Sequence, residues 1–94
     1  MGQAFIVVNL DKKQYLHPHE FGDGYKLIEL SDVLSGLAIL LANSDDHPWA
    51  DAPHFGEWSG DRIVVMGEYS AAYDDMRGTY EQVGSDLARY LKDQ

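Results

Sequence analysis

The chain has 94 residues, a formal charge of −9 and no cysteine. This length suits one domain, and 45% apolar residues suffice for a core, which argues against disorder. The lack of thiols excludes disulfides and thiolate metal sites, and the negative charge argues against direct binding to nucleic acid or to an anionic membrane.

The beginning of the sequence carries no basic flank and no long apolar segment, so no signal peptide is expected there. No stretch of the chain approaches the length of a membrane span. We therefore expect a cytoplasmic protein that forms a single compact domain over residues 1–94.

Residues 4–10 (AFIVVNL) predict a β-strand that is apolar on both faces. The polar break at 11–13 and the return of apolar residues at Tyr15 and Leu16 predict a hairpin. Residues 25–30 predict either a short strand or a lead-in to the following helix. The two readings cannot be separated from the pattern.

A helix is predicted over residues 31–43, with Ser31 as its N-cap and apolar residues at helical spacing along it. Gly36 lies inside this helix, where glycine costs about 1 kcal/mol relative to alanine. A close approach to another element would explain its presence. Residues 44–56 then form a long loop, a kind of segment that is often functional.

Residues 63–66 (IVVM) are an unbroken apolar run between Gly60 and Gly67, which predicts a central strand covered on both faces. Residues 55–58 are expected to pair with it as a second hairpin across the turn at 59–60.

Residues 70–78 are expected to be a polar connector. The last helix is predicted to start at Thr79, because Thr79 and Gln82 match a capping box, and it would contain Gly84. The predicted fold class is therefore α+β: a small antiparallel sheet of two hairpins with two helices packed on it, in the order ββ(β)α-ββα.

The charge is unevenly distributed, because no Lys or Arg lies between Lys26 and Arg62. One reading is a solvated acidic surface that keeps the protein soluble or adapts it to high salt. The other is a negative patch for a basic partner, one whose usual ligand is nucleic acid. The residues predicted to bind this partner are Asp45, Asp46, Trp49, Asp51, Glu57, Trp58 and Asp61.

His17 and His19 flank Pro18, and two imidazoles at this spacing on an extended backbone point to the same side. They predict half of a site for a divalent transition metal, with His47 and His54 of the long loop as further ligands. The alternative is that these histidines make ordinary hydrogen bonds and that the protein has no cofactor. No motif in the sequence predicts a catalytic residue.

Two blocks of sequence resemble a family of small uncharacterised bacterial proteins. The first begins with MGQ and continues as NLDKKQYLHPH and FGDG over residues 9–24, and the second is WSGDRIVV with GEY over residues 58–69. The resemblance implies no named activity, and the acid-rich loop departs from the family's pattern. The residues to which it draws attention are Asn9, Asp11, Lys12, Tyr15, His19, Trp58, Asp61 and Arg62.

These observations favour a non-enzymatic acidic interaction module that inhibits a basic, nucleic-acid-binding partner. Phage anti-defence proteins, anti-CRISPR proteins among them, are analogous in size and charge. The alternative is a small metal-binding protein or metal-dependent enzyme that uses the four histidines.

Overall fold

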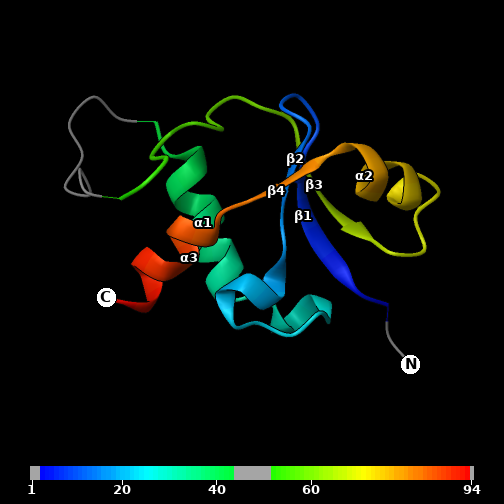
Figure 1. Ribbon diagram of the computed structural model, residues 1–94, viewed down its shortest axis with the longest axis horizontal. Helices are drawn as coiled ribbons and strands as arrows, with labels where there is room; N and C mark the ends of the chain where they lie inside the picture. Colours follow the sequence, from blue (N-terminus) through cyan, green and yellow to red (C-terminus); the bar gives the residue numbers. More distant parts are fainter. Residues whose placement is uncertain (1–2, 44–51, 94) are drawn as a thin grey trace.

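In the computed structural model, which describes residues 3–43 and 52–93, four strands form one sheet with helices on both faces (Figure 1). The strands are β1 (Phe5–Asn9), β2 (Gln14–Leu16), β3 (Ile63–Gly67) and β4 (Glu81–Val83), in the spatial order β3-β1-β2-β4. β1 pairs antiparallel with β2 and β3, whereas β2 and β4 are parallel. The α+β class is confirmed, but the sheet is mixed and not wholly antiparallel.

Three α-helices and two short 3₁₀ helices accompany the sheet in the described part of the chain. They are η1 (Pro18–Phe21), η2 (Leu27–Glu29), α1 (Asp32–Leu41), α2 (Tyr73–Thr79) and α3 (Ser85–Lys92). None of the helices within residues 3–43 and 52–93 is long and apolar enough to cross a membrane. Because η2 leads directly into α1, the second of the two readings of residues 25–30 is confirmed.

Side chains from the two faces of the sheet enter two separate cores, as strand alternation requires. Val7 and Leu16 pack with α1, α3 and η1 on one face, whereas Ile6, Val8 and Tyr15 pack with Met76 of α2 on the other. Figure 1 shows α1 and α3 together on one side and α2 apart from them. The apolar character of both faces of β1 therefore follows from helices above and below it.

β3 is an edge strand, so the prediction that residues 63–66 form a central strand is wrong. The run is apolar on both faces because Ile63 packs against the core with α1 and Met66 against the core with α2. An apolar run reports that both faces of a strand are covered, and it carries no information about the strand's position in the sheet.

The second predicted hairpin is also wrong. Residues 53–60 form turns and not a strand, and β3 pairs with β1 instead. The backbone N–H of Trp58 donates to the carbonyl of Leu40, at 2.9 Å, and that of Gly56 to the carbonyl of Ile39, at 3.0 Å. The segment thus binds the carbonyls at the end of α1, which no local pattern reveals.

The C-terminal third differs most from prediction. The polar connector contains α2, and the helix predicted to start at Thr79 begins after β4, at Ser85. Gly84 precedes that helix with a φ of +101°, and a Cβ there would lie 2.7 Å from Leu16 Cδ2. Glycine is required at this position for both reasons.

Ser31 makes no side-chain capping bond, contrary to prediction. The cap comes instead from Asp23, a buried carboxylate that accepts backbone N–H bonds from Ser31, Asp32 and Val33 at 2.8–3.1 Å. These donors have no partner within the helix, and a negative charge suits a helix N-terminus. Gly36 does meet the expected close approach, because a Cβ there would lie 2.8 Å from Phe21 Cε2.

Candidate functional site

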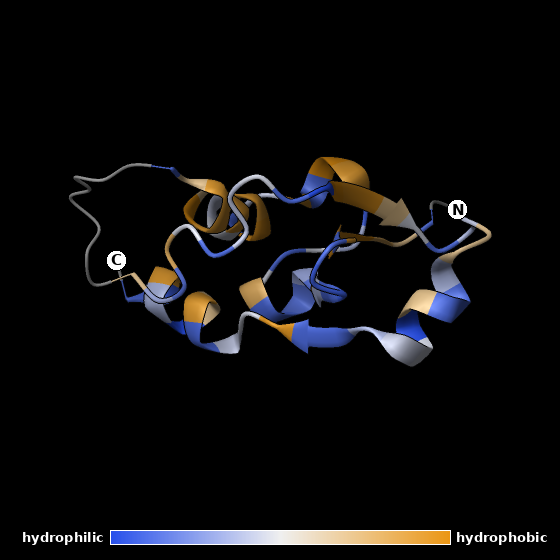
Figure 2. Ribbon diagram, turned by 90° about the horizontal axis from the view of Figure 1, so that it is seen from above, coloured by the Kyte–Doolittle hydropathy of each residue, from blue (hydrophilic) through white to orange (hydrophobic). Residues whose placement is uncertain are grey.

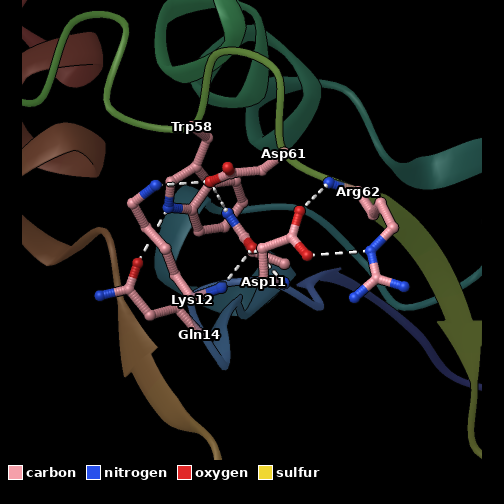
Figure 3. Close-up of polar contacts among 7 residues, drawn as sticks. Asp11, Lys12, Gln14, Trp58, Asp61 and Arg62 are labelled. Atoms are coloured by element: carbon pink, nitrogen blue, oxygen red, sulfur yellow. Dashed lines mark hydrogen bonds and ion pairs between the residues drawn. The ribbon is translucent and has the colours of Figure 1, made fainter.

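The two sequence blocks meet in space where the β1–β2 turn contacts the start of β3 (Figure 3). Asn9, at the end of β1, is fully buried. Its Oδ1 accepts the backbone N–H bonds of Asp11 and Lys12, at 2.9 and 2.8 Å, and its Nδ2 donates to Asp61 Oδ2 at 2.8 Å. One buried amide therefore shapes the turn and binds it to the second block.

Two ion pairs surround Asn9. Lys12 Nζ lies 2.6 Å from Asp61 Oδ2, and Asp11 accepts both the backbone N–H and the Nε–H of Arg62, at 2.8 and 2.9 Å. Hydrogen bonds from Asn9 and then Lys12 lower the pKa of Asp61, and those from the backbone and side chain of Arg62 lower the pKa of Asp11. We name this network of Asn9, Asp11, Lys12, Asp61 and Arg62 the clasp.

The clasp changes the role of one predicted partner-binding residue. The carboxylate of Asp61 is 16% exposed and already binds a lysine and an amide. It therefore stabilises the fold and is not a free negative charge for a partner.

Trp58 is a core residue, so its prediction as a partner-binding residue is wrong. It is 1% exposed, and its indole N–H donates to Gln14 Oε1 at 2.9 Å. Its ring joins the core with Leu40 and Leu87. The tryptophan next to the acidic loop therefore joins that segment to the sheet and to α1, and it offers no surface to a partner.

Four of the predicted loop residues, Asp45, Asp46, Trp49 and Asp51, lie outside the described residues, as does His47. Glu57 is described and exposed, and its Oε2 lies 2.6 Å from His54 Nδ1. The other ring nitrogen of His54, Nε2, lies 2.7 Å from Asp86 Oδ2 at the start of α3. Since carboxylates only accept, a protonated imidazole with two N–H groups satisfies both partners.

The pKa values of this trio follow the geometry. The hydrogen bond to Glu57, with a further one to Asp86, raises the pKa of His54 against the opposing effect of burial. Burial acts to raise the pKa of Asp86, but the hydrogen bond and charge of His54, together with backbone hydrogen bonds from Leu87 and from Asp86 itself, outweigh it and lower this pKa. His54 also has a φ of +62°, an uncommon conformation for a residue with a side chain.

His17 and His19 do lie together, but the predicted extended backbone is wrong, because η1 begins at Pro18 and contains His19. Their ring centroids are 5.7 Å apart, and the ring of Tyr25 lies 4.0 Å from that of His19. Burial, followed by the charges of His19 and Arg77, lowers the pKa of His17. A lowered pKa favours the neutral ring, and Nε2 lies 3.4 Å from the hydroxyl oxygen of Tyr25.

The four-histidine metal site is not formed by the residues that the structure describes. His54 is held by two carboxylates and lines a different cavity from His19. Within residues 3–43 and 52–93, no three His, Asp or Glu side chains are arranged to hold a metal ion. The spacing of His17 and His19 predicted their contact. It gave no information on whether His54, which is far away in the sequence, joins them.

Two hollows lie near these groups. One, of about 50 Å³, lies between Trp58, His54, Gln14 and Gly84. The other is an open hollow of about 440 Å³ beside His19, Tyr25, Lys26 and Glu68. The first holds little more than a water molecule or two, and the second is broad and open to solvent.

Comparison with known protein families, with curated proteins and with solved structures finds no match to this chain. The resemblance of the two blocks to small bacterial proteins therefore stays a prediction. What the structure adds is their physical relation. Eight residues carry the resemblance, and six of them are the five clasp residues and Trp58. The clasp joins the two blocks, and Trp58 fills the core and binds Gln14 of the first block.

Proposed function

We propose that this protein is a non-enzymatic module that binds a basic protein through its acidic surface. The observation that carries the proposal is a set of exposed carboxylates that form no ion pair with any Lys, Arg or His among the described residues. They are Glu29, Asp32, Glu68, Asp74, Asp75, Glu81 and Asp93.

The described bases do not compensate for these acids. Residues 3–43 and 52–93 contain 13 of the 16 acidic residues and all 7 Lys and Arg residues. Lys12 and Arg62 are occupied by the clasp. The three remaining acids, Asp45, Asp46 and Asp51, add to the negative charge of a stretch that has no Lys or Arg from 27 to 61.

Such a charge distribution favours fast, salt-sensitive association with a positive surface. Proteins that bind nucleic acid present surfaces of this kind, because phosphate contacts dominate their affinity. We therefore propose a nucleic-acid-binding protein as the partner and its inhibition as the outcome, in analogy of size and charge with phage anti-defence and anti-CRISPR proteins.

The polar side chains of the clasp and of Asp23 already bind groups within the fold, which supports a binding role for the protein over a catalytic one. Asn9 binds two backbone N–H groups and Asp61. Asp61 also binds Lys12, and Asp11 binds Arg62. Asp23 is bound to three backbone N–H groups. These side chains are occupied in holding the fold. The seven exposed carboxylates, by contrast, form no ion pair with a described Lys, Arg or His and are accessible to a partner.

The test is capture of partners from a lysate of the source cell, elution by a salt gradient, and affinity measurement with each purified partner. The D45K/D46K/D51K variant is compared with the matched D74K/D75K/E81K variant. Each substitution changes the formal charge by two, so both variants move from −9 to −3. We expect both variants to bind more weakly than the unmodified chain, because both remove exposed carboxylates, and the loop variant to lose at least tenfold more affinity than the matched one, because its acids lie in the stretch without Lys or Arg.

Equal affinity of the loop variant and the unmodified protein would overturn the proposal for this surface. Equal losses in both variants would indicate general attraction by net charge and no defined site. If no basic partner is released at any salt concentration, metal analysis of untagged protein tests the remaining His17–His19 pair.

A further inference from the structure

The outer edge of β3 carries backbone groups that no residue within 3–43 and 52–93 binds through its backbone. The N–H of Leu10 donates to the carbonyl of Arg62, and the N–H of Glu68 donates to that of Ala4, at 2.9 Å each. In an antiparallel pair, alternate residues turn their backbone groups toward the partner strand. Residues 62, 64, 66 and 68 therefore face β1, and Ile63, Val65 and Gly67 face away from it.

No described residue makes a backbone hydrogen bond to the outward N–H and carbonyl groups of Ile63 and Val65. The Gly67 carbonyl accepts a bond from the N–H of Ser70, at 2.9 Å. The Val65 side chain, in the middle of the strand, is 38% exposed. Figure 2 shows β3 as an apolar strand along one long margin of the molecule.

This edge lacks the usual protection against pairing. Exposed edges of soluble proteins are commonly short or carry charges, prolines or bulges. β3 has five residues, IVVMG, with neither a charge nor a proline among them. An edge of this composition is a template for another strand.

The residues that flank β3 identify the strand that fits. In a two-fold antiparallel pairing of β3 with β3 of a second copy, centred on Val65, Ile63 lies opposite Gly67 and Arg62 lies opposite Glu68. Residues that face outward then meet each other, as the hydrogen-bond pattern requires. Opposite charges face each other at both ends of the pairing, which stabilises a sheet.

Both charged groups are accessible. The Arg62 side chain is 74% exposed and uses only its Nε–H and backbone N–H toward Asp11, so its terminal nitrogens point away from the clasp (Figure 3). Glu68 is exposed, and one of its oxygens accepts the Ala4 N–H. A pairing shifted by two residues would place Arg62 opposite Met66, which loses the charge match.

We propose that two copies of this chain associate through β3, antiparallel about a two-fold axis at Val65, with Arg62 of each copy paired to Glu68 of the other. The same surface serves both copies, as a closed two-fold dimer requires. The two four-stranded sheets become one continuous sheet in which β4 forms both outer edges. This association uses Glu68, one of the seven exposed carboxylates named above, and leaves the other six exposed.

Sedimentation equilibrium of the unmodified chain over a wide concentration range tests the association. We expect a mass that rises from 10.6 kDa toward twice that value. A mass of 10.6 kDa at every concentration up to about the millimolar range would overturn the proposal.

The register is tested by two charge reversals, R62E and E68R. The R62E copy presents glutamate at both positions and the E68R copy presents arginine at both, so each variant alone juxtaposes like charges. We expect each to self-associate at least tenfold more weakly than the unmodified chain. When the two variants are mixed, opposite charges meet at both ends of the pairing and association is restored.

Mixed association that is no stronger than that of either variant alone would overturn this register. Circular dichroism verifies that each variant is folded. Should R62E fail to fold because it disrupts the clasp, V65K replaces it. This variant places a lysine in the centre of the edge and is expected to be monomeric, whereas V65T is expected to associate like the unmodified chain.

Discussion

The two edges of the sheet are built differently. β4 has three residues, of which Glu81 and Gln82 are exposed, and it joins the sheet through a parallel pairing with β2. β3 has five apolar residues and is held at its start by buried groups, namely Trp58 and the Asn9 amide. A short polar edge resists pairing with another strand. A longer apolar edge that is held in an extended conformation favours such pairing.

Removal of the apolar anchor before β3 is expected to have the largest effect. Trp58→Ala deletes a fully buried ring from the core and should lower the free energy of unfolding by about 3–5 kcal/mol. Urea denaturation measures the loss. Trp58→Phe retains most of the apolar volume and loses the bond to Gln14, so a larger loss in this variant than in Trp58→Ala would contradict the packing role.

Removal of the polar anchor should have the next largest effect. Asn9→Ala leaves the N–H groups of Asp11 and Lys12 and the Asp61 carboxylate without their bonds to the amide. The expected loss is about 1–3 kcal/mol in the same measurement. On the other edge, Gln82→Ala removes an exposed contact with Glu20 and should cost about 0.5 kcal/mol or less. Similar losses of stability in Asn9→Ala and Gln82→Ala would show that β3 is not held more firmly than β4.

A lysine placed on each edge compares the edges directly. Val65→Lys should abolish self-association and change the free energy of unfolding of the monomer by less than about 1 kcal/mol, because the side chain is already partly exposed. Gln82→Lys on β4 should leave self-association unchanged. Equal effects on association, measured by sedimentation, would show that β3 is not the interface.

The smallest expected effect is the change of stability with pH that His54 causes. His54 binds Glu57 within residues 52–60 and Asp86 at the start of α3, so the second contact joins this segment to α3. The pKa of His54 is raised by the contact with Glu57 and then by that with Asp86. A raised pKa stabilises the fold fully below the unfolded value of about 6.5, and this contribution disappears as the pH rises through the folded value. Since the side chain is 39% exposed, we expect less than about 1 kcal/mol.

The matched variant for this prediction is His54→Asn, because asparagine tolerates the positive φ and carries no charge. Urea midpoints measured from about pH 6 to pH 8.5 should fall in the unmodified protein and remain level in this variant. A parallel fall in both proteins would assign the pH dependence to another group. The anchors of β3 carry no imidazole and should not respond over this range.

The sequence by itself determined the features that depend on neighbouring residues. Unbroken apolar runs located β1 and β3, and the return of apolar residues after a polar break located β2. Helical spacing located α1, and Gly36 indicated a close approach that Phe21 makes. The α+β class followed from these elements. The contact between His17 and His19 was also predictable, because only Pro18 lies between them in the sequence.

Only the tertiary structure decided what depends on partners far along the chain. It placed β3 at an edge, moved Trp58 into the core, and joined Asn9 to Asp61 across 52 residues. It also placed His54 in a different hollow from His19 and bound it to Asp86, 32 residues away. Local patterns record which faces of an element are buried. They do not record which element covers those faces, because many distant partners satisfy the same apolar or polar requirement.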